Sequence, residues 1–364
     1  MAESNPTAPV RSGEELDWQA LDEHLKKVIP GLEGQPGISQ FASGNSNLTY
    51  RLKYANEDLV IRRPPFGTKA KSAHSMIREY RVMNALKPVY ACVPDTLYYT
   101  DDASIIGSEF YVMRKVEGQV IKATIPDEWG FKAAETRLLC RRFWEKLIEL
   151  HQVDYRAAGL EDFGKPQGYI QRQVLGWNGR YERVITPDVG EFSDVRQWLE
   201  TNMPPESGHH AILHGDYRID NVILDARDPT ELRAVIDWEI CALGEPLMDL
   251  GNALAYWMEP GDPPYLKALQ MQPSTAEGMM TRSEILALYG ESTGRDTSGF
   301  LFYLIYGYFR NAVILQQIYY RFYQGQTQDE RFRSFGAATR NLGEHCRLLI
   351  SGQGTQGQGI SSHG

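Results

Sequence analysis

The stretch from Ile212 to Asp249 constrains this chain more than any other part of its sequence. Short apolar runs in it lie next to polar clusters, a pattern typical of short buried strands that deliver polar side chains to one place. The polar clusters contain Asp216, Asn221 and Asp237. Carboxylate and amide oxygens in a loop and at a strand end are ligands that Mg²⁺ prefers, above all where phosphate completes its coordination. The stretch therefore predicts a site for a hard cation.

Length and charge limit the kind of protein that surrounds this stretch. The chain has 364 residues, enough for two lobes, because single hydrophobic cores stop growing at about 250–300 residues. Its formal net charge of −9 disfavours a nucleic-acid-binding protein, which needs a basic surface to neutralise phosphates. The four cysteines have no C-x-x-C spacing and predict buried, reduced thiols.

The sequence predicts neither export nor insertion into a membrane. Met1–Gln19 is polar and acidic, unlike a signal peptide. The most apolar run, Phe300–Phe309, is followed at once by Arg310 and Asn311 and is too short to span a bilayer. We therefore expect a cytoplasmic protein that binds neither nucleic acid nor membranes. Whether it forms a homo-oligomer is left open.

The first third of the chain predicts a small α+β lobe. Residues 1–12 have the composition of a flexible terminus, and a helical pattern over Trp18–Ile29 follows them. Five strand-like runs come next, with one amphipathic helix, Ala73–Leu86, inserted among them. The five runs are Ile38–Phe41, Ser46–Tyr54, Leu59–Arg63, Asp95–Thr100 and Phe110–Val116. A further short run, Ser104–Gly107, lies between the last two.

Long helical patterns replace strands after Gly118. They cover Lys132–His151, Val195–Asn202, Arg282–Gly290, Gly299–Gln324 and Asp329–Ser351. The stretch 212–249 interrupts them as a minimal pair of strands, and residues 352–364 form a flexible tail rich in Gly, Gln and Ser. The change near Val116–Val120 predicts a boundary between a mostly β lobe, residues 13–117, and a mostly α lobe, residues 118–351.

The loop between the first two strand-like runs is a candidate phosphate-binding site. It contains Ser43, Gly44, Asn45 and Ser46. Small polar residues between two strands can direct backbone N–H groups and hydroxyls toward a phosphate. Such clusters are more often ordinary turns, so the loop alone is open to both interpretations.

Asp216, Arg218 and Asn221 together point to phosphoryl transfer. This reaction needs a carboxylate that holds the acceptor hydroxyl, a cation that bridges phosphates, and positive charge near the moving phosphoryl group. Asp216 can act as the base, Asn221 as a metal ligand and Arg218 as the positive charge. A capped surface loop would explain one of these residues but hardly all three.

The sequence H-G-D-Y-R-I-D-N, with the aspartate of I-D-W-E sixteen residues after its asparagine, resembles the motifs of the aminoglycoside phosphotransferase and choline kinase superfamily. The residues of these two motifs look closest to those of phosphotransferase domains related to acyl-CoA dehydrogenase-linked kinases. The resemblance covers roughly residues 30–350. It implies a bilobal protein-kinase-like α+β fold, with a small five-stranded antiparallel N-terminal lobe and a larger, mainly helical C-terminal lobe. It also implies ATP and Mg²⁺ as cofactors and a small-molecule hydroxyl as acceptor.

By this resemblance, Asp216 is the catalytic aspartate and His214 orients its loop. Asn221 and Asp237 are the implied Mg²⁺ ligands. Arg218 stands where protein kinases often place a phosphate-contacting lysine.

Two further carboxylates lie near these motifs. By the resemblance, Asp249 is a structural carboxylate that braces the segment after Asp237. Glu239 can reach a second metal ion in principle, but a surface position explains it equally well.

The nucleotide-binding residues follow from the same resemblance. Protein kinases use a lysine on the third strand to contact phosphates and to pair with a glutamate on the next helix. The resemblance assigns these roles to Arg62 and Glu79, although arginine for lysine changes the geometry. Arg63 competes with Arg62, because the two side chains point to opposite faces and the apolar pattern does not settle which face is which. Adenine is expected against the backbone of Met113 and Lys115.

The acceptor is expected to contact residues 169–183 and 251–257. The first segment carries three arginines and three aromatic residues: Tyr169, Arg172, Trp177, Arg180, Tyr181 and Arg183. This composition suits an anionic acceptor, such as a hydroxyacyl-CoA, better than a polycationic aminoglycoside. An exposed basic helix packed through its aromatic residues explains the segment equally well. The alternative functions are an aminoglycoside-type antibiotic kinase and a nucleotide-binding pseudokinase that regulates a partner.

Overall fold

The computed structural model describes residues 7–41, 47–66 and 75–352, which belong to two compact units. The first unit contains residues 1–121, 154–163 and 220–241, and the second contains residues 122–153, 164–219 and 242–364. The predicted domain limits, 13–117 and 118–351, stay a prediction, because each unit combines segments that are far apart in the sequence.

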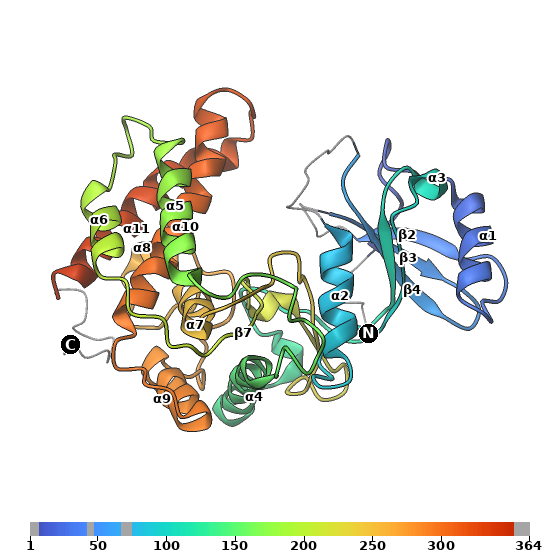
Figure 1. Ribbon diagram of the computed structural model, residues 1–364, viewed down its shortest axis with the longest axis horizontal. Helices are drawn as coiled ribbons and strands as arrows, with labels where there is room; N and C mark the ends of the chain where they lie inside the picture. The colour runs from blue at the N-terminus through green and yellow to red at the C-terminus, as the bar shows by residue number, and fades with distance from the viewer. Residues whose placement is uncertain (1–6, 42–46, 67–74, 353–364) are drawn as a thin grey trace. The chain divides into compact units, whose positions relative to one another are not determined.

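The first unit is built on an antiparallel sheet with the strand order β1-β2-β3-β4-β6-β5 (Figure 1). Within the described residues its strands are β1 (Thr7–Ala8), β2 (Gly37–Phe41), β3 (Leu48–Lys53), β4 (Asp58–Arg63), β5 (Thr96–Thr100) and β6 (Phe110–Arg114). The last five correspond to the predicted runs, so the sheet has one strand more than predicted. The extra strand comes from the terminus that was predicted to be flexible. Thr7 pairs with Phe41, and the amide of Arg11 donates to the side chain of Gln40 at 2.9 Å.

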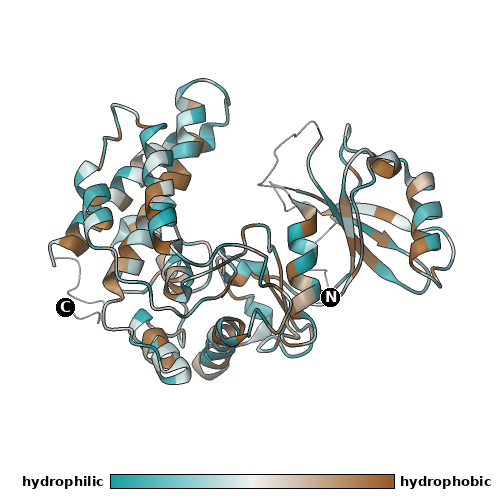
Figure 2. Cartoon of the chain, in the orientation of Figure 1, coloured by the Kyte–Doolittle hydropathy of each residue, from teal (hydrophilic) through white to brown (hydrophobic). Residues whose placement is uncertain are grey.

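Helices cover both faces of this sheet (Figure 1). The helices α1 (Trp18–Val28) and α3 (Ala103–Ile106) pack on one face, and α2 (Met76–Leu86) packs on the other, against β5 and β6. Bands of polar and apolar residues alternate along α1 in Figure 2, as expected for a helix with one buried side. The helix α3 forms where a further short run was noted at Ser104–Gly107, because Asp102 caps its start and Gly107 ends it with a φ of 82°.

Side chains of β4 alternate between these two faces. Leu59 and Ile61 belong to the apolar core under α1, together with Tyr50 of β3 and Val112 of β6. Because side chains alternate along a strand, Arg62 must point to the opposite face, the one that α2 covers. The packing of α1 thus decides which face of the sheet carries Arg62 and which carries Arg63. The apolar pattern of the strand left this open.

A second, two-stranded ladder in the first unit joins β8 (Val222–Leu224) to β9 (Leu232–Val235). Val222 lies opposite Val235, and the short helix η2 (Ile219–Asn221) leads into β8. The chain segment after β6 also meets this ladder, where Gln119 bridges to Leu224. A Cβ atom on the neighbouring Gly118 would lie 2.2 Å from the carbonyl oxygen of Leu224, so this close approach requires glycine.

The second unit is mainly helical. Its described α-helices are α4 (Ala133–Gln152), α5 (Tyr169–Glu182), α6 (Ser193–Thr201), α7 (Pro246–Ala255), α8 (Pro264–Lys267), α9 (Arg282–Thr293), α10 (Leu301–Tyr323) and α11 (Phe335–Ile350). It also contains the short helices η1 (Asp127–Trp129) and η3 (Glu330–Ser334), and the paired strands β7 (Ala211–Leu213) and β10 (Ala242–Gly244). Five of the α-helices, α4, α6, α9, α10 and α11, match predicted helical patterns.

The helix α10 forms the centre of the second unit and packs against α5, α7 and α11 (Figure 1). Its contact with α7 is unusually close. A Cβ atom on Gly307 would lie 2.4 Å from the carbonyl oxygen of Gly251, and one on Gly251 would lie 2.4 Å from the carbonyl oxygen of Tyr303. A larger residue at either glycine would therefore push α7 and α10 apart.

The structure also bears on the thiols and on membrane insertion. All four cysteines are free and buried, which confirms the predicted burial. Among the described helices, none has the length and the apolar composition that crossing a membrane requires.

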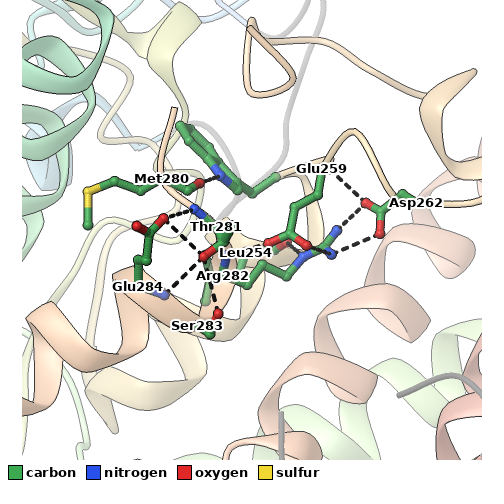
Figure 3. Close-up of polar contacts among 9 residues, drawn as sticks. Leu254, Glu259, Asp262, Met280, Thr281, Arg282, Ser283 and Glu284 are labelled. Carbon is green, nitrogen blue, oxygen red and sulfur yellow. Dashed lines mark hydrogen bonds and ion pairs between the residues drawn. The ribbon is translucent and has the colours of Figure 1, made fainter. Parts of the chain in front are cut away.

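A buried ionic cluster fixes the start of α9 (Figure 3). The side chain of Arg282 is 0% exposed, and its guanidinium donates to the Asp262 carboxylate at 3.0 and 2.6 Å. Glu259 lies 3.5 Å from Nη1 of Arg282 and accepts a hydrogen bond from the Arg282 backbone N–H. At the same helix start, Thr281 and Glu284 form a capping box.

We expect Arg282→Met to lower the free energy of unfolding by about 3–5 kcal/mol, because it leaves two buried carboxylates without their cation. Arg137→Met is the matched control. This variant also removes an arginine that is paired with a carboxylate, that of Glu284. The side chains of Arg137 and Glu284 are, however, each about two-fifths exposed. An exposed pair contributes only about 0–1 kcal/mol. Urea denaturation of both variants measures the difference, and equal losses would contradict the prediction.

Candidate functional site

In the first unit, Arg62 of β4 contacts carboxylates from two other segments. Its Nη1 lies 3.1 Å from Oε2 of Glu79, which is on α2. Its Nη2 lies 3.1 Å from Oδ1 of Asp237 and 4.0 Å from Oε2 of Glu239, both of which follow β9. Arg62 therefore joins the α2 side of the sheet to the I-D-W-E segment.

Glu79 is held by three partners although its side chain is only 1% exposed. Besides Arg62, the hydroxyl of Tyr111 donates to Oε2 at 2.9 Å and Nδ2 of Asn47 donates to Oε1 at 3.1 Å. Burial raises the pKa of Glu79, and the opposing effect of Arg62 only partly offsets it. Burial by itself lowers the pKa of Arg62, but Glu79, Tyr111 and Asp237 outweigh burial and hold that pKa well above its ordinary value.

Arg63 points to the other face of the sheet. Its guanidinium donates to the carbonyl oxygens of Pro64 and Ile106, each at 3.0 Å, and lies 3.9 Å from the ring centroid of Phe66. It is buried, and burial lowers its pKa. The geometry gives Arg62, not Arg63, the glutamate partner.

Asn221 and Asp237 lie at the same end of the β8–β9 ladder. The backbone N–H of Ile236 donates to the carbonyl oxygen of Asn221 at 2.9 Å, directly beyond the pair Val222 and Val235. Asp237 has a φ of 69°, an uncommon conformation for a residue other than glycine, and its side chain is 36% exposed. An amide oxygen and a carboxylate, brought close by one ladder, are a donor set that suits Mg²⁺. Among the described residues, no three His, Cys, Asp or Glu side chains could hold a metal ion together.

The remaining nucleotide-binding predictions stay predictions. Ser43, Gly44, Asn45 and Ser46 lie outside the described residues. Met113 pairs with Val60 and Thr96 inside the sheet. The backbone N–H of Lys115 donates to the carbonyl oxygen of Asp58 at 2.8 Å, so this N–H is not available to an adenine base.

In the second unit, Asp249 fixes the backbone of the H-G-D loop. Its Oδ2 accepts from the N–H of His214 and its Oδ1 from the N–H of Gly215, each at 2.8 Å, and Nε2 of His151 lies 3.2 Å from Oδ2. Burial raises the pKa of Asp249, but the hydrogen bond and the charge of His151, with help from His214 and Gly215, hold it below its ordinary value.

The predicted role of Asp249 needs a correction. It was expected to brace the segment after Asp237, but it braces the segment before Asp216. The reason is the pairing of β7 with β10, in which Leu213 lies opposite Ala242. Gly244, at the end of β10, lies opposite Ala211, and α7 begins two residues later and packs against β7. Asp249 in the first turn of α7 thus reaches the N–H groups that follow β7.

His214 and Arg218 flank Asp216. The N–H of Asp216 donates to Nδ1 of the buried His214 ring at 3.3 Å, and Nη2 of Arg218 lies 3.5 Å from Oδ2 of Asp216. The Arg218 guanidinium also lies 5.1 Å from the ring centroid of Tyr256. The side chains of Asp216 and Arg218 remain partly exposed, at 23% and 14%.

Sequence reasoning missed Arg310, which lies next to this loop. Its Nη2 donates to the carbonyl oxygen of Gly215 at 3.1 Å, and its guanidinium lies 5.3 Å from the ring centroid of Trp177. The signal was present, because Arg310 interrupts the most apolar run of the chain. In the sequence alone, this interruption indicates only that the run is too short to span a membrane.

The structure thus brings the predicted residues together in two groups. Arg62, Glu79 and Asp237 meet in the first unit, with Asn221 beside them in the β8–β9 ladder. The second unit holds the other group, which consists of His214, Asp216 and Arg218. In the sequence, only residues 219 and 220 separate Arg218 from Asn221.

Comparisons with known proteins agree with this arrangement. Residues 37–282 match the model of the phosphotransferase enzyme family. Acyl-CoA dehydrogenase family member 11 of Gallus gallus is 33% identical over 357 residues, which cover 94% of this chain and 45% of that protein. Family member 10 of Mus musculus is 33% identical over 341 residues, which cover 93% of this chain and 31% of that protein. The chain therefore spans less than half the length of these relatives.

Solved structures that resemble more than nine-tenths of the chain include a putative phosphotransferase and a choline kinase. A putative aminoglycoside phosphotransferase from Ralstonia eutropha JMP134 superposes with a TM-score of 0.81 and 30% identity, and the match covers 93% of this chain and 99% of that one. Choline kinase from Cryptosporidium parvum superposes with a TM-score of 0.63 over 94% of this chain and 98% of that one. It is only 12% identical, so it speaks for the fold alone. The predicted kinase-like fold class and the family resemblance are confirmed.

The Arg62–Glu79 pair predicts a pH-dependent loss of stability. A buried carboxylate with a raised pKa contributes stability below the ordinary glutamate pKa and loses it as the pH rises through the folded-state value. Arg62→Met removes the cation that opposes burial, so the pKa of Glu79 rises further. We expect the destabilisation by Arg62→Met to grow by about 1–3 kcal/mol between about pH 5 and pH 8.

Urea denaturation at several pH values measures this trend. The matched control is the double variant Arg62→Met/Glu79→Gln, which has no titrating group at residue 79 and should lose most of the trend. A destabilisation by Arg62→Met that does not change with pH would show that Arg62 does not govern the charge of Glu79.

Proposed function

Because the chain belongs to the phosphotransferase enzyme family, we propose that it transfers the γ-phosphate of ATP, with Mg²⁺, to a hydroxyl group of a small molecule. The observation that carries this proposal is the group formed by Arg62, Glu79 and Asp237. A strand cation that pairs with a helix glutamate, next to a metal-binding aspartate, is the arrangement with which kinases hold nucleotide phosphates.

Arg62 contacts the nucleotide phosphates in this proposal. A guanidinium binds phosphate oxygens bidentately, and its charge does not depend on pH in the physiological range. Glu79 keeps the guanidinium in place through the contact at 3.1 Å, and Tyr111 and Asn47 in turn fix Glu79. The phosphate-binding residue is thus preorganised by buried partners.

Asp216 is the base that accepts the proton of the acceptor hydroxyl. Its backbone belongs to a loop whose N–H groups are held by Asp249 and by the ring of His214. Fixed in this way, the carboxylate keeps one orientation toward the hydroxyl, which favours a near-attack geometry. Arg218 supplies positive charge beside it for the equatorial oxygens of the moving phosphoryl group.

Asn221 and Asp237 would hold Mg²⁺ through an amide oxygen and a carboxylate oxygen. When bound, the cation neutralises charge on the β- and γ-phosphates. When no cation is bound, the contact with Arg62 supplies a counter-charge to the Asp237 carboxylate.

The acceptor that we propose is an anionic hydroxylated molecule, such as a hydroxyacyl-CoA. Arg180 and Arg183 of the predicted acceptor segment support an anion, and the relatives named acyl-CoA dehydrogenases point to an acyl group. An aminoglycoside-type acceptor is the second candidate, since the R. eutropha protein with 30% identity is described as a putative aminoglycoside phosphotransferase.

We expect Asp216→Asn to lower kcat by about 10²–10⁴-fold, the usual contribution of a general base, while Mg·ATP binding is kept. Phosphorylated product is measured by mass spectrometry on panels of hydroxyacyl-CoAs and aminoglycosides, and nucleotide binding by thermal shift. Asp296→Asn is the matched control, because it makes the same exchange at an exposed loop residue and should leave turnover unchanged.

The outcomes separate the alternatives. Wild-type turnover on hydroxyacyl-CoAs that disappears in Asp216→Asn supports the proposal. Turnover on aminoglycosides alone would favour the antibiotic kinase. Nucleotide binding without turnover on any panel would favour a pseudokinase that regulates a partner.

A further inference from the structure

Arg310 is a buried cation with an unused hydrogen-bond donor. The residue lies in the middle of α10 and is only 6% exposed. Its Nη2 donates to the carbonyl oxygen of Gly215 at 3.1 Å, whereas its buried Nη1 has no hydrogen-bond partner among the described residues. An unsatisfied donor on a buried charged group costs free energy unless a ligand completes it.

In the described part of the chain, no carboxylate lies within 4.0 Å of the guanidinium nitrogens of Arg310, so Arg310 forms no direct ion pair there. The other deeply buried arginine of this unit, Arg282, contacts both Asp262 and Glu259. Buried cations are normally paired, because transfer of a charge from water into a protein is costly. Arg310 departs from that rule at a position beside the H-G-D loop.

The groups that face Arg310 come from several elements of the second unit. Trp177 of α5 has its ring centroid 5.3 Å from the guanidinium, and Asp216 is near enough to interact with it electrostatically. The phenols of Tyr169, Tyr256 and Tyr306 also interact electrostatically with it. Burial lowers the pKa of Arg310, but these groups outweigh burial and raise it, so the guanidinium stays charged.

We propose that Nη1 of Arg310 donates to an anionic oxygen of the acceptor, and that Arg310 thereby selects acceptors whose hydroxyl lies close to a carboxylate or an equivalent oxygen. This inference rests on the proposed function, because it takes Asp216 as the base. An anion at Nη1 would accept a hydrogen bond from the unused donor and form the direct ion pair that Arg310 lacks among the described residues.

The position of Arg310 limits how far apart the two acceptor groups can be. Its guanidinium donates a hydrogen bond to the carbonyl oxygen of Gly215, the residue that precedes Asp216. An acceptor that offers its hydroxyl to Asp216 and its anion to Arg310 must carry both within one short segment. The carboxylate of a free hydroxy acid satisfies this requirement. The neutral carbonyl oxygen of its thioester lies at the same position and can accept the hydrogen bond, but it supplies no charge. The distant phosphates of a coenzyme A group do not satisfy the requirement, and the ammonium groups of an aminoglycoside would be repelled.

Arg310→Gln tests the inference with short hydroxyalkanoates that differ in the position of the hydroxyl, their coenzyme A thioesters, and diols in which CH₂OH replaces the carboxylate. We expect KM for the preferred hydroxyalkanoate or thioester to rise by about 10- to 100-fold, the contribution of one charge-assisted hydrogen bond. KM for ATP and the low turnover of the diols should change little. Arg310→Lys, which keeps the charge but not the planar fork, should recover part of the loss.

Arg321→Gln is the matched control, because it makes the same exchange at an exposed arginine of the same helix. The thermal midpoint separates binding from structure: loss of a buried charge that has no direct ion pair should leave the midpoint of Arg310→Gln within a few degrees of wild type. A much lower midpoint with unchanged KM for the acid would make Arg310 structural and overturn the inference.

Failure of the inference can be told from failure of the proposed function. Wild-type turnover that is equal for hydroxyalkanoates, thioesters and diols, and equal in Arg310→Gln, overturns the inference while phosphoryl transfer stands. If no acceptor is phosphorylated, calorimetric titration of wild type and Arg310→Gln with the hydroxyalkanoates decides. Binding that requires Arg310 would support the anion site without the reaction, and absence of binding in both would overturn it.

Discussion

A single buried carboxylate, Asp249, determines the shape of the loop on which the proposed chemistry depends. It accepts hydrogen bonds from two successive backbone N–H groups, those of His214 and Gly215, and lies against His151. Buried backbone donors must be satisfied, and a carboxylate satisfies two of them at once. Because Asp249 lies in the first turn of α7, whose N-terminus favours negative charge, the loop is tied to the helical core of the second unit. The backbone that leads into Asp216 is therefore held by a residue from a distant part of the sequence.

The buried arginines of the protein differ in how their charge is compensated, and the difference separates structure from function. Arg282 is fully enclosed and contacts two carboxylates, so its cluster is complete and serves to anchor α9. Arg62 contacts Glu79 and Asp237, of which Asp237 is partly exposed and can exchange partners. Arg310 has an unused donor and no carboxylate within ion-pair distance in the described chain. A buried charged group that lacks a hydrogen-bond partner and a direct ion pair is a natural binding site for a ligand of opposite charge.

The sequence predicted the structure well where the local pattern of apolar residues was periodic or formed a clear run of strand length. Apolar runs of strand length predicted β2 to β6, and helical periodicity predicted α1, α2 and α10 to within a few residues. It did less well where a long-range contact decides the local structure. β1 forms because Thr7 meets Phe41 on a distant strand, and α7 was not predicted, although Gly251 and Gly307 allow it to pack against α10. Neither contact is visible in a window of neighbouring residues.

The sequence by itself determined which chemical groups the chain contains and how they are spaced. Asp216, Asn221 and Asp237 are recognisable because a motif is a property of residue order. Only the tertiary structure decided which partners those groups have. Arg62 and Arg63 are equivalent in the sequence, and α1 separates them because its apolar side covers the face of β4 that carries Ile61. Arg310 appeared as an interruption of an apolar run, and only the packing of α10 brings it beside Gly215. Burial and pairing depend on segments that are distant in the chain, so they emerge only when the chain folds.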